Sequence, residues 1–165
     1  NPDNPITNIR AIGDNPARIS RLATAWLGAI QAEGVAATAK HFPGDGIDDR
    51  DQHLLTSINT MPFDQWQETF GAVWRAVIDA GVMCIMPGHI SLPDYQGYRE
   101  RPDDAPPATF SRKLLIDLLR DELGYDGLIV SDNASMLGVT VHFDPEERIV
   151  QAIASGIDIY LNADP

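Results

Sequence analysis

The chain alternates between predicted helices and short apolar strands, and this alternation restricts the possible folds more than any other feature. Each helical pattern ends at or near a glycine and leads into a short apolar run. The first helix is expected to begin at Asn15 and Pro16 and to end at Gly34, and residues 35–39 follow at once as a strand. The pattern repeats with helices near 64–81, 111–124 and 144–156 and with strands at 82–86, 128–130 and 157–161. Because these strands are apolar without alternation, we expect an α/β fold with a parallel sheet buried on both faces.

Two architectures satisfy this order of elements, an open doubly wound sheet and a β/α barrel. A complete barrel usually takes about 250 residues, whereas the chain has 165. If it is a barrel, the chain supplies roughly its middle half, and the other strands come from further sequence or from another chain. Both architectures gather functional groups at the carboxyl ends of the strands. The unusual residues at those ends are Lys40, His41, His89, Asp132 and Asn162.

Large apolar residues at helical spacing are expected to form the core, with no cofactor role. Cys84 is the only cysteine and lies in an apolar run, so we interpret it as a small buried hydrophobic residue. Residues 94–107, rich in Pro and Asp, are expected to form a long loop that covers a site. The expected core residues are Ile19, Leu22, Trp26, Leu27 and Ile30 in the first helix, Trp66, Phe70, Val73, Trp74, Val77 and Ile78 in the second, and Leu114, Leu115, Leu118 and Leu119 in the third.

The net charge of −12 restricts the partners of the chain. A nucleic-acid footprint would need clustered Lys and Arg, and adsorption to anionic lipid would need the same charges. No apolar run in the sequence is long enough to span a membrane. A neutral or cationic small-molecule ligand therefore fits the composition better than nucleic acid or lipid.

The segment richest in candidate catalytic residues reads Lys-His-Phe-Pro-Gly-Asp-Gly over residues 40–46, and Asp51 and His53 follow it. In an extended loop a spacing of two turns both side chains the same way, so a carboxylate–imidazole hydrogen bond is feasible. An imidazole titrates near neutrality, and a neighbouring carboxylate holds its tautomer, which suits a general acid. The glycines at 44 and 46 would let this loop swing in and out.

Each of these residues also has a structural interpretation. Asp132, after a buried strand, would cap the following turn, and His53 would be a solvated loop residue. Lys40 would be a surface lysine, and Arg10 would pair with an acidic neighbour. The acidic segment 48–53 also suggests a metal, but its spacing matches neither an EF-hand loop nor a zinc signature.

Several motifs occur in order along the chain: Lys-His-Phe-Pro-Gly-x-Gly at 40–46, Met86-Pro87-Gly88-His89, Pro107-Ala108-Thr109-Phe110-Ser111 and Gly127-Leu128-Ile129-Val130-Ser131-Asp132. Together they resemble the family 3 glycoside hydrolases over essentially the whole chain. The pair Asp51-x-His53 is similar to the signature of the β-N-acetylglucosaminidase (β-hexosaminidase) branch, which the β-glucosidase branch lacks. The resemblance implies that residues 1–165 are part of a single N-terminal-type barrel domain, a (β/α)8 TIM barrel, as its strands four to seven.

The resemblance also implies a role for each site residue. Asp132 matches the catalytic nucleophile of the family, His53 matches the unusual acid/base of this branch, and Asp51 matches the carboxylate that orients it. The residues implied to bind the substrate are Lys40, His41 and Arg10, which would hold the hydroxyls of the sugar, and His89, which would line the site.

The activity implied is that of a retaining exo-β-N-acetylglucosaminidase, which would release terminal β-linked GlcNAc from a cell-wall or chitin-derived saccharide through a covalent glycosyl-Asp intermediate. No metal and no organic cofactor is expected. The alternatives are a family 3 β-glucosidase, a GlcNAc phosphorylase and a non-catalytic saccharide-binding half-barrel. The compartment, cytoplasmic or secreted, stays open.

Two residues depart from the family pattern. Asp45 stands where the family usually has a histidine, which adds an anion near the proposed proton donor or would favour a substrate of different charge. Asn133 follows Asp132 where an acidic or small residue is commoner. Neither departure removes a catalytic group.

Overall fold

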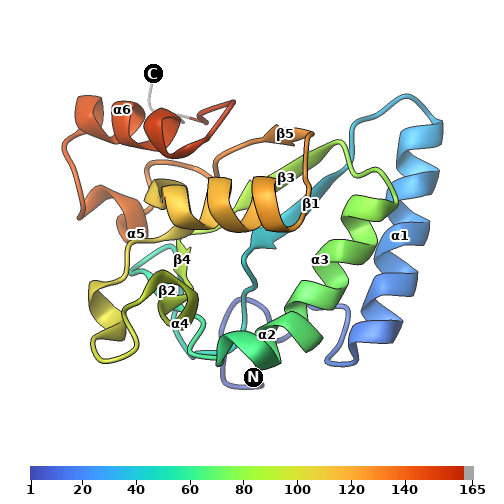
Figure 1. Ribbon diagram of the computed structural model, residues 1–165, viewed down its shortest axis with the longest axis horizontal. Coiled ribbons are helices and arrows are strands. Elements are labelled where there is room, and N and C mark those ends of the chain that lie inside the picture. Colours follow the sequence, from blue (N-terminus) through green and yellow to red (C-terminus); the bar gives the residue numbers. More distant parts are fainter. Residues whose placement is uncertain (162–165) are drawn as a thin grey trace.

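The computed structural model describes residues 1–161 and is built on a parallel sheet (Figure 1). Strand β1 (Thr38–Phe42) pairs with β3 (Cys84–Pro87), and β3 pairs with β5 (Leu128–Ile129), so the order is β1-β3-β5. Val130 adds a parallel bridge to Ile159, within the segment expected to be the last strand. The predicted α/β fold with a parallel sheet is therefore confirmed.

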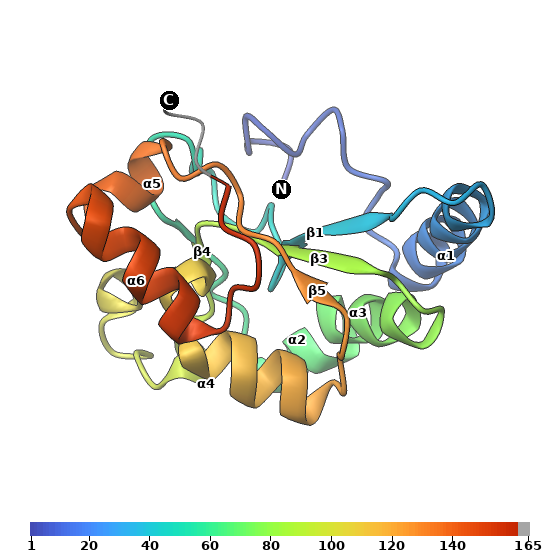
Figure 2. The ribbon, with the colours of Figure 1, turned by 90° about the horizontal axis from the view of Figure 1, so that it is seen from above.

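The principal helices lie along one side of this sheet (Figure 2). They are α1 (Pro16–Ala32), α3 (Phe70–Asp79), η3 (Lys113–Glu122), which is wound as a π-helix, and α6 (Pro145–Ser155). Each strand of this sheet pairs with the sheet strand that follows it in the sequence, so the order has no reversal, and the helices form an arc outside. A doubly wound sheet would have helices on both faces and a reversal of strand order, so this arrangement is a segment of a β/α barrel.

The helix boundaries follow the local signals in the sequence. The side chain of Asn15 accepts a hydrogen bond from the Arg18 N–H at the start of α1, and Gly34 follows its end with φ +77°. Helix α6 begins after Asp144 and ends at Gly156, which has φ +116°. These glycines adopt left-handed conformations that other residues rarely take.

Three details differ from the expectations. Strand β1 begins at Thr38 rather than at residue 35, because its register is set by pairing with Cys84. The single helix expected over 64–81 is two helices, α2 (Phe63–Glu68) and α3, separated at Thr69 with φ −111° and ψ −88°. Two residues of the first helix expected in the core are exposed: Trp26 is 62% exposed, because it projects about 100° around α1 from the buried Leu27, and Ile30 is 45% exposed.

Two tryptophans beneath β1 hold the turn that follows the strand. Trp66 and Trp74 are buried, and both indole N–H groups donate to the Pro43 carbonyl, at 2.9 and 3.0 Å. The Phe42 ring packs edge-on against Trp74 with centroids 5.3 Å apart. Core packing therefore fixes the backbone immediately after His41.

Short elements occupy the loops beyond the carboxyl ends of the strands. β2 (Ser57–Ile58) and β4 (Ile90–Ser91) form a second parallel pair. The expected long loop 94–107 is partly helical, since it includes most of α4 (Pro93–Gln96) and all of η1 (Pro102–Asp104). The other short helices are η2 (Ala108–Phe110) and α5 (Leu137–Thr140). Asn162, expected at the end of the last strand, lies outside the described residues. Within residues 1–161, none of the helices combines the length and the apolar character needed to cross a bilayer.

Candidate active site

The ends of β1 and β5 bring His41 and Asp132 into contact. His41 Nε2 lies 3.2 Å from Asp132 Oδ2, and the Asn133 N–H donates to the other carboxylate oxygen at 2.8 Å. Partial burial would raise the pKa of Asp132, but the bonds from His41 and Asn133 outweigh it and hold that pKa well below its usual range. Asp132 is therefore an ionised carboxylate that remains 17% exposed.

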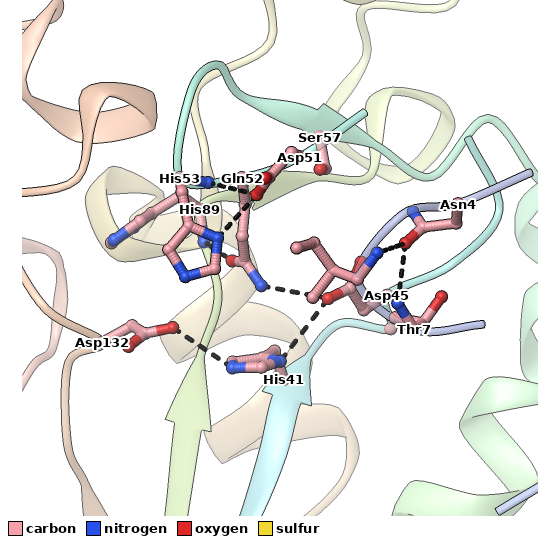
Figure 3. A network of polar contacts seen from close by, with 12 residues as sticks. Asn4, Thr7, His41, Asp45, Asp51, Gln52, His53, Ser57, His89 and Asp132 are labelled. Atoms are coloured by element: carbon pink, nitrogen blue, oxygen red, sulfur yellow. Dashed lines mark hydrogen bonds and ion pairs between the residues drawn. The ribbon is translucent and has the colours of Figure 1, made fainter. Parts of the chain in front are cut away.

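His41 lies between two carboxylates. Its other ring nitrogen, Nδ1, is 3.6 Å from Asp45 Oδ2, and both side chains are almost fully buried. Burial lowers the pKa of His41, but the contacts with Asp132 and Asp45 outweigh that effect and raise it overall. The raised pKa favours the imidazolium form of His41, whose ring lies between Asp132 and Asp45 (Figure 3).

The predicted carboxylate–imidazole pair is present in the loop after β1. His53 Nδ1 lies 2.6 Å from Asp51 Oδ1, which also accepts the His53 backbone N–H at 2.9 Å. Burial raises the pKa of Asp51, but these bonds and the charge of Arg10 outweigh that effect and lower the pKa overall. The His53 side chain is 52% exposed, so a ligand can reach the ring. The predicted carboxylate–imidazole contact is confirmed, but it forms within a turn at residues 52–54 rather than in an extended loop, since the Leu54 N–H donates to the Asp51 carbonyl at 2.9 Å.

His89 follows β3 and is fully buried. In the neutral ring Nε2 donates to the Asn133 carbonyl at 3.1 Å, which can only accept, and Nδ1 accepts from the Thr109 hydroxyl at 3.0 Å. Desolvation lowers the pKa of His89 to about 4, so the ring is neutral near pH 7. Both nitrogens have partners within the protein, and a direct sugar contact by His89 stays a prediction.

Electrostatic coupling shows that these groups form one cluster. The charges of Asp132, His41 and His53 all influence the pKa of His89. Their side chains gather beyond the ends of the strands in Figure 3. Lys40 and Arg10 are both exposed. Lys40 precedes His41 in β1, and the charge of Arg10 acts on Asp51. A sugar contact by either residue stays a prediction.

The loop that carries His53 is anchored from several directions. The buried Asn4 side chain donates to the carbonyls of Asp48 and Arg50 at 3.0 and 3.2 Å. The Leu137 N–H donates to the His53 carbonyl at 3.0 Å. The β2–β4 pair fixes the end of the loop.

Close packing around Gly44 and Gly46 leaves no room for a side chain at either position. A Cβ on Gly44 would overlap the Phe70 ring, and one on Gly46 would lie 2.7 Å from the Thr7 hydroxyl oxygen. Both have positive φ, +141° and +94°. Loop movement on substrate binding stays a prediction.

Three features of the site were not foreseen from the sequence. Gln52, between the two members of the predicted pair, is 1% exposed and contacts Asp45 instead of solvent. Asn4 lies far from any motif. Asp45 points inward to His41, so it does not present its charge to a substrate as one interpretation proposed. Among residues 1–161, no group of three acidic, histidine or cysteine side chains has the arrangement of a metal site.

Comparison with known proteins identifies similar chains. The family model "Glycosyl hydrolase family 3 N terminal domain" matches residues 1–165. A β-N-acetylglucosaminidase/β-glucosidase of Cellulomonas fimi is 47% identical over 163 residues, which is 96% of this chain and 28% of that protein. A β-hexosaminidase of Vibrio cholerae is 39% identical over 156 residues, covering 92% of this chain and 43% of the relative.

Solved structures agree with the fold along the whole chain. A β-glucoside phosphorylase bound to 2FGlc superposes with TM-score 0.92 at 36% identity, over 100% of this chain and 30% of that one. A β-N-acetylglucosaminidase from a Paenibacillus strain superposes with TM-score 0.90 at 34% identity, over 98% and 30%. The chain thus spans less than half the length of these proteins, and the half-barrel architecture is confirmed.

Proposed function

Because the chain belongs to glycosyl hydrolase family 3, we propose that it carries the catalytic groups of a retaining exo-β-N-acetylglucosaminidase that hydrolyses terminal β-linked GlcNAc. The observation that carries this proposal is the 2.6 Å contact of Asp51 with His53, in the same polar cluster as an ionised Asp132. Glycoside hydrolysis needs a nucleophile for the anomeric carbon and a proton for the leaving oxygen. These residues offer one of each.

In the first step Asp132 Oδ attacks C1 of the sugar as the bond from C1 to the leaving oxygen breaks. His53 gives the Nε2 proton to that oxygen, and Asp51 at Nδ1 stabilises the imidazole in this orientation. The products are a glycosyl-Asp132 ester, a neutral His53 and the released alcohol.

In the second step water attacks C1 of the ester. His53 Nε2 takes a proton from this water, the bond from C1 to Asp132 breaks, and the carboxylate is regenerated. Two inversions at C1 retain the β configuration. The sugar hydroxyls would be bound by Lys40, Arg10 and His41, as the resemblance implies.

A family 3 β-glucosidase and a phosphorylase are second candidates. The Cellulomonas fimi relative is named for both glucosaminidase and glucosidase activity, and one solved relative is a β-glucoside phosphorylase. A neutral histidine base would repel an incoming phosphate less than a carboxylate would. The exposed His53 is compatible with either water or phosphate as the acceptor.

The test compares nitrophenyl β-GlcNAc with nitrophenyl β-glucoside, each with and without inorganic phosphate, using the full-length protein. The proposal expects higher kcat/KM for the GlcNAc substrate and no phosphate dependence. Glucose preference, or a sugar 1-phosphate as product, would replace it with one of the second candidates. If no β-glycoside were turned over and Asp132→Asn changed no property, a non-catalytic saccharide-binding role would stand instead.

A further inference from the structure

A continuous series of buried polar contacts connects the proposed nucleophile to the loop of the proposed acid/base (Figure 3). It runs from Asp132 to His41 at 3.2 Å and from His41 to Asp45 at 3.6 Å. Gln52 Nε2 then donates to Asp45 Oδ2 at 3.0 Å, and Gln52 Oε1 accepts the His89 backbone N–H at 3.0 Å. Asp45 is the member that contacts both His41 and Gln52.

We propose that Asp45 is a positioning residue for the reaction proposed above: through His41 it orients Asp132, and through Gln52 it fixes the loop that carries Asp51 and His53. The proposal rests on the proposed function for its kinetic consequences. The contacts themselves do not depend on that function.

The charge of Asp45 favours the imidazolium form of His41. An imidazolium carries a proton on each ring nitrogen and a positive charge, so it interacts favourably with Asp132 at 3.2 Å and with Asp45 at 3.6 Å, whereas a neutral ring presents an N–H to only one of these carboxylates. Besides Asp132 and Asp45, the charged or titratable neighbours of His41 are Lys40, which disfavours the imidazolium, and the neutral His89. A single carboxylate would have to offset both Lys40 and the burial of the ring.

Gln52 links Asp45 to the loop that carries Asp51 and His53. Its amide is held at both ends, by Asp45 and by the His89 backbone, and its side chain is almost completely buried. Residues 52–54 form a turn in which the Leu54 N–H donates to the Asp51 carbonyl at 2.9 Å, so the buried Gln52 amide helps to hold the turn that carries Asp51 and His53. Losing the Asp45 carboxylate would loosen one of the two bonds that hold Gln52 in this turn.

The experiment compares Asp45→Asn with Asp49→Asn in the full-length protein. Both variants remove one negative charge from the same loop, but Asp49 is exposed. We expect Asp45→Asn to lower kcat about 10- to 100-fold, as small misplacements of catalytic groups do, with little change in KM. The alkaline limb of its pH profile should move to lower pH, because His41 loses its proton more readily beside one carboxylate than between two. Asp49→Asn should change neither kcat nor the profile.

Titration of the His41 ring by NMR in the same variants gives a readout independent of activity, with the signal assigned by a His41→Gln variant. The pKa of His41 should fall in Asp45→Asn and stay unchanged in Asp49→Asn, and Asp45→Glu should restore most of both the pKa and kcat. An identical His41 pKa in the wild type and Asp45→Asn, or superimposable pH profiles, would overturn the proposal. If the wild type turned over no glycoside, the titration would still test the Asp45–His41 contact, and only the proposed function would fail.

Discussion

Replacing His53 by alanine should slow the reaction selectively, according to how much the leaving group needs a proton. The ring is half exposed and its partner Asp51 lies on the same loop, so truncation leaves no buried cavity and no buried orphan charge. The effect should therefore be on catalysis, with little loss of folding free energy. A nitrophenolate leaves without protonation, whereas a sugar alkoxide does not.

The expected magnitude follows from the role of His53. A positioned general acid contributes about 10²- to 10⁴-fold, or about 3 to 5 kcal/mol of transition-state stabilisation. We expect a loss in this range of kcat/KM for a natural disaccharide and less than about tenfold for the nitrophenyl glycoside. Because the 2.6 Å contact with Asp51 holds the imidazole, Asp51→Asn should produce a similar pattern of smaller size.

The assay measures kcat/KM over a series of glycosides whose leaving groups differ in pKa. Leu54→Ala is the matched control, since Leu54 is the next residue in the loop and is 59% exposed. It should leave the slope against leaving-group pKa unchanged, while His53→Ala should steepen it. Equal losses for activated and natural substrates would refute the role of His53 as proton donor.

Three further predictions concern other parts of the site. Asp132→Asn should lower turnover at least about a thousandfold on activated and natural substrates alike, and an unchanged kcat would exclude it as nucleophile. Gly44→Ala should lower the free energy of unfolding in urea by about 1 to 3 kcal/mol, because the new Cβ would overlap the Phe70 ring. The control is Gly28→Ala in the middle of α1, where a Cβ meets no other atom, and it should raise the free energy of unfolding by about 0.5 to 1 kcal/mol. The pKa of His89 falls from 6.5 to about 4 in the folded state. Between these pH values only the unfolded state takes up this proton, so stability should decline by about 3 kcal/mol as pH falls. His89→Gln should remove most of this slope, and an unchanged slope would contradict the buried neutral ring.

The helices could be predicted closely because their signals are local. Asn15 caps α1, and Gly34 and Gly156 end helices with backbone conformations that depend on those residues alone. Strand β1 was shifted because its register depends on Cys84, a partner far along the chain. The break at Thr69 was missed because the apolar spacing continues through it.

The site was predictable where one rule governed position. The spacing of Asp51 and His53 predicted their contact, and the rule that functional groups gather at the carboxyl ends of parallel strands placed His41 and Asp132 at the same end of the sheet, where the structure brings them to 3.2 Å. The inward turn of Gln52 could not be anticipated, because a single buried amide between a half-buried Asp51 and an exposed His53 has no sequence pattern of its own.

The catalytic role of Asp132 is tested most directly by trapping its covalent intermediate. A fluorinated β-glycoside with an activated leaving group should form the ester rapidly and release it slowly. Mass spectrometry of proteolytic fragments should then find the added sugar on the peptide that contains Asp132, and Asp132→Asn should carry no label. A label on another carboxylate, or unlabelled wild-type protein that still turns over the compound, would contradict the account.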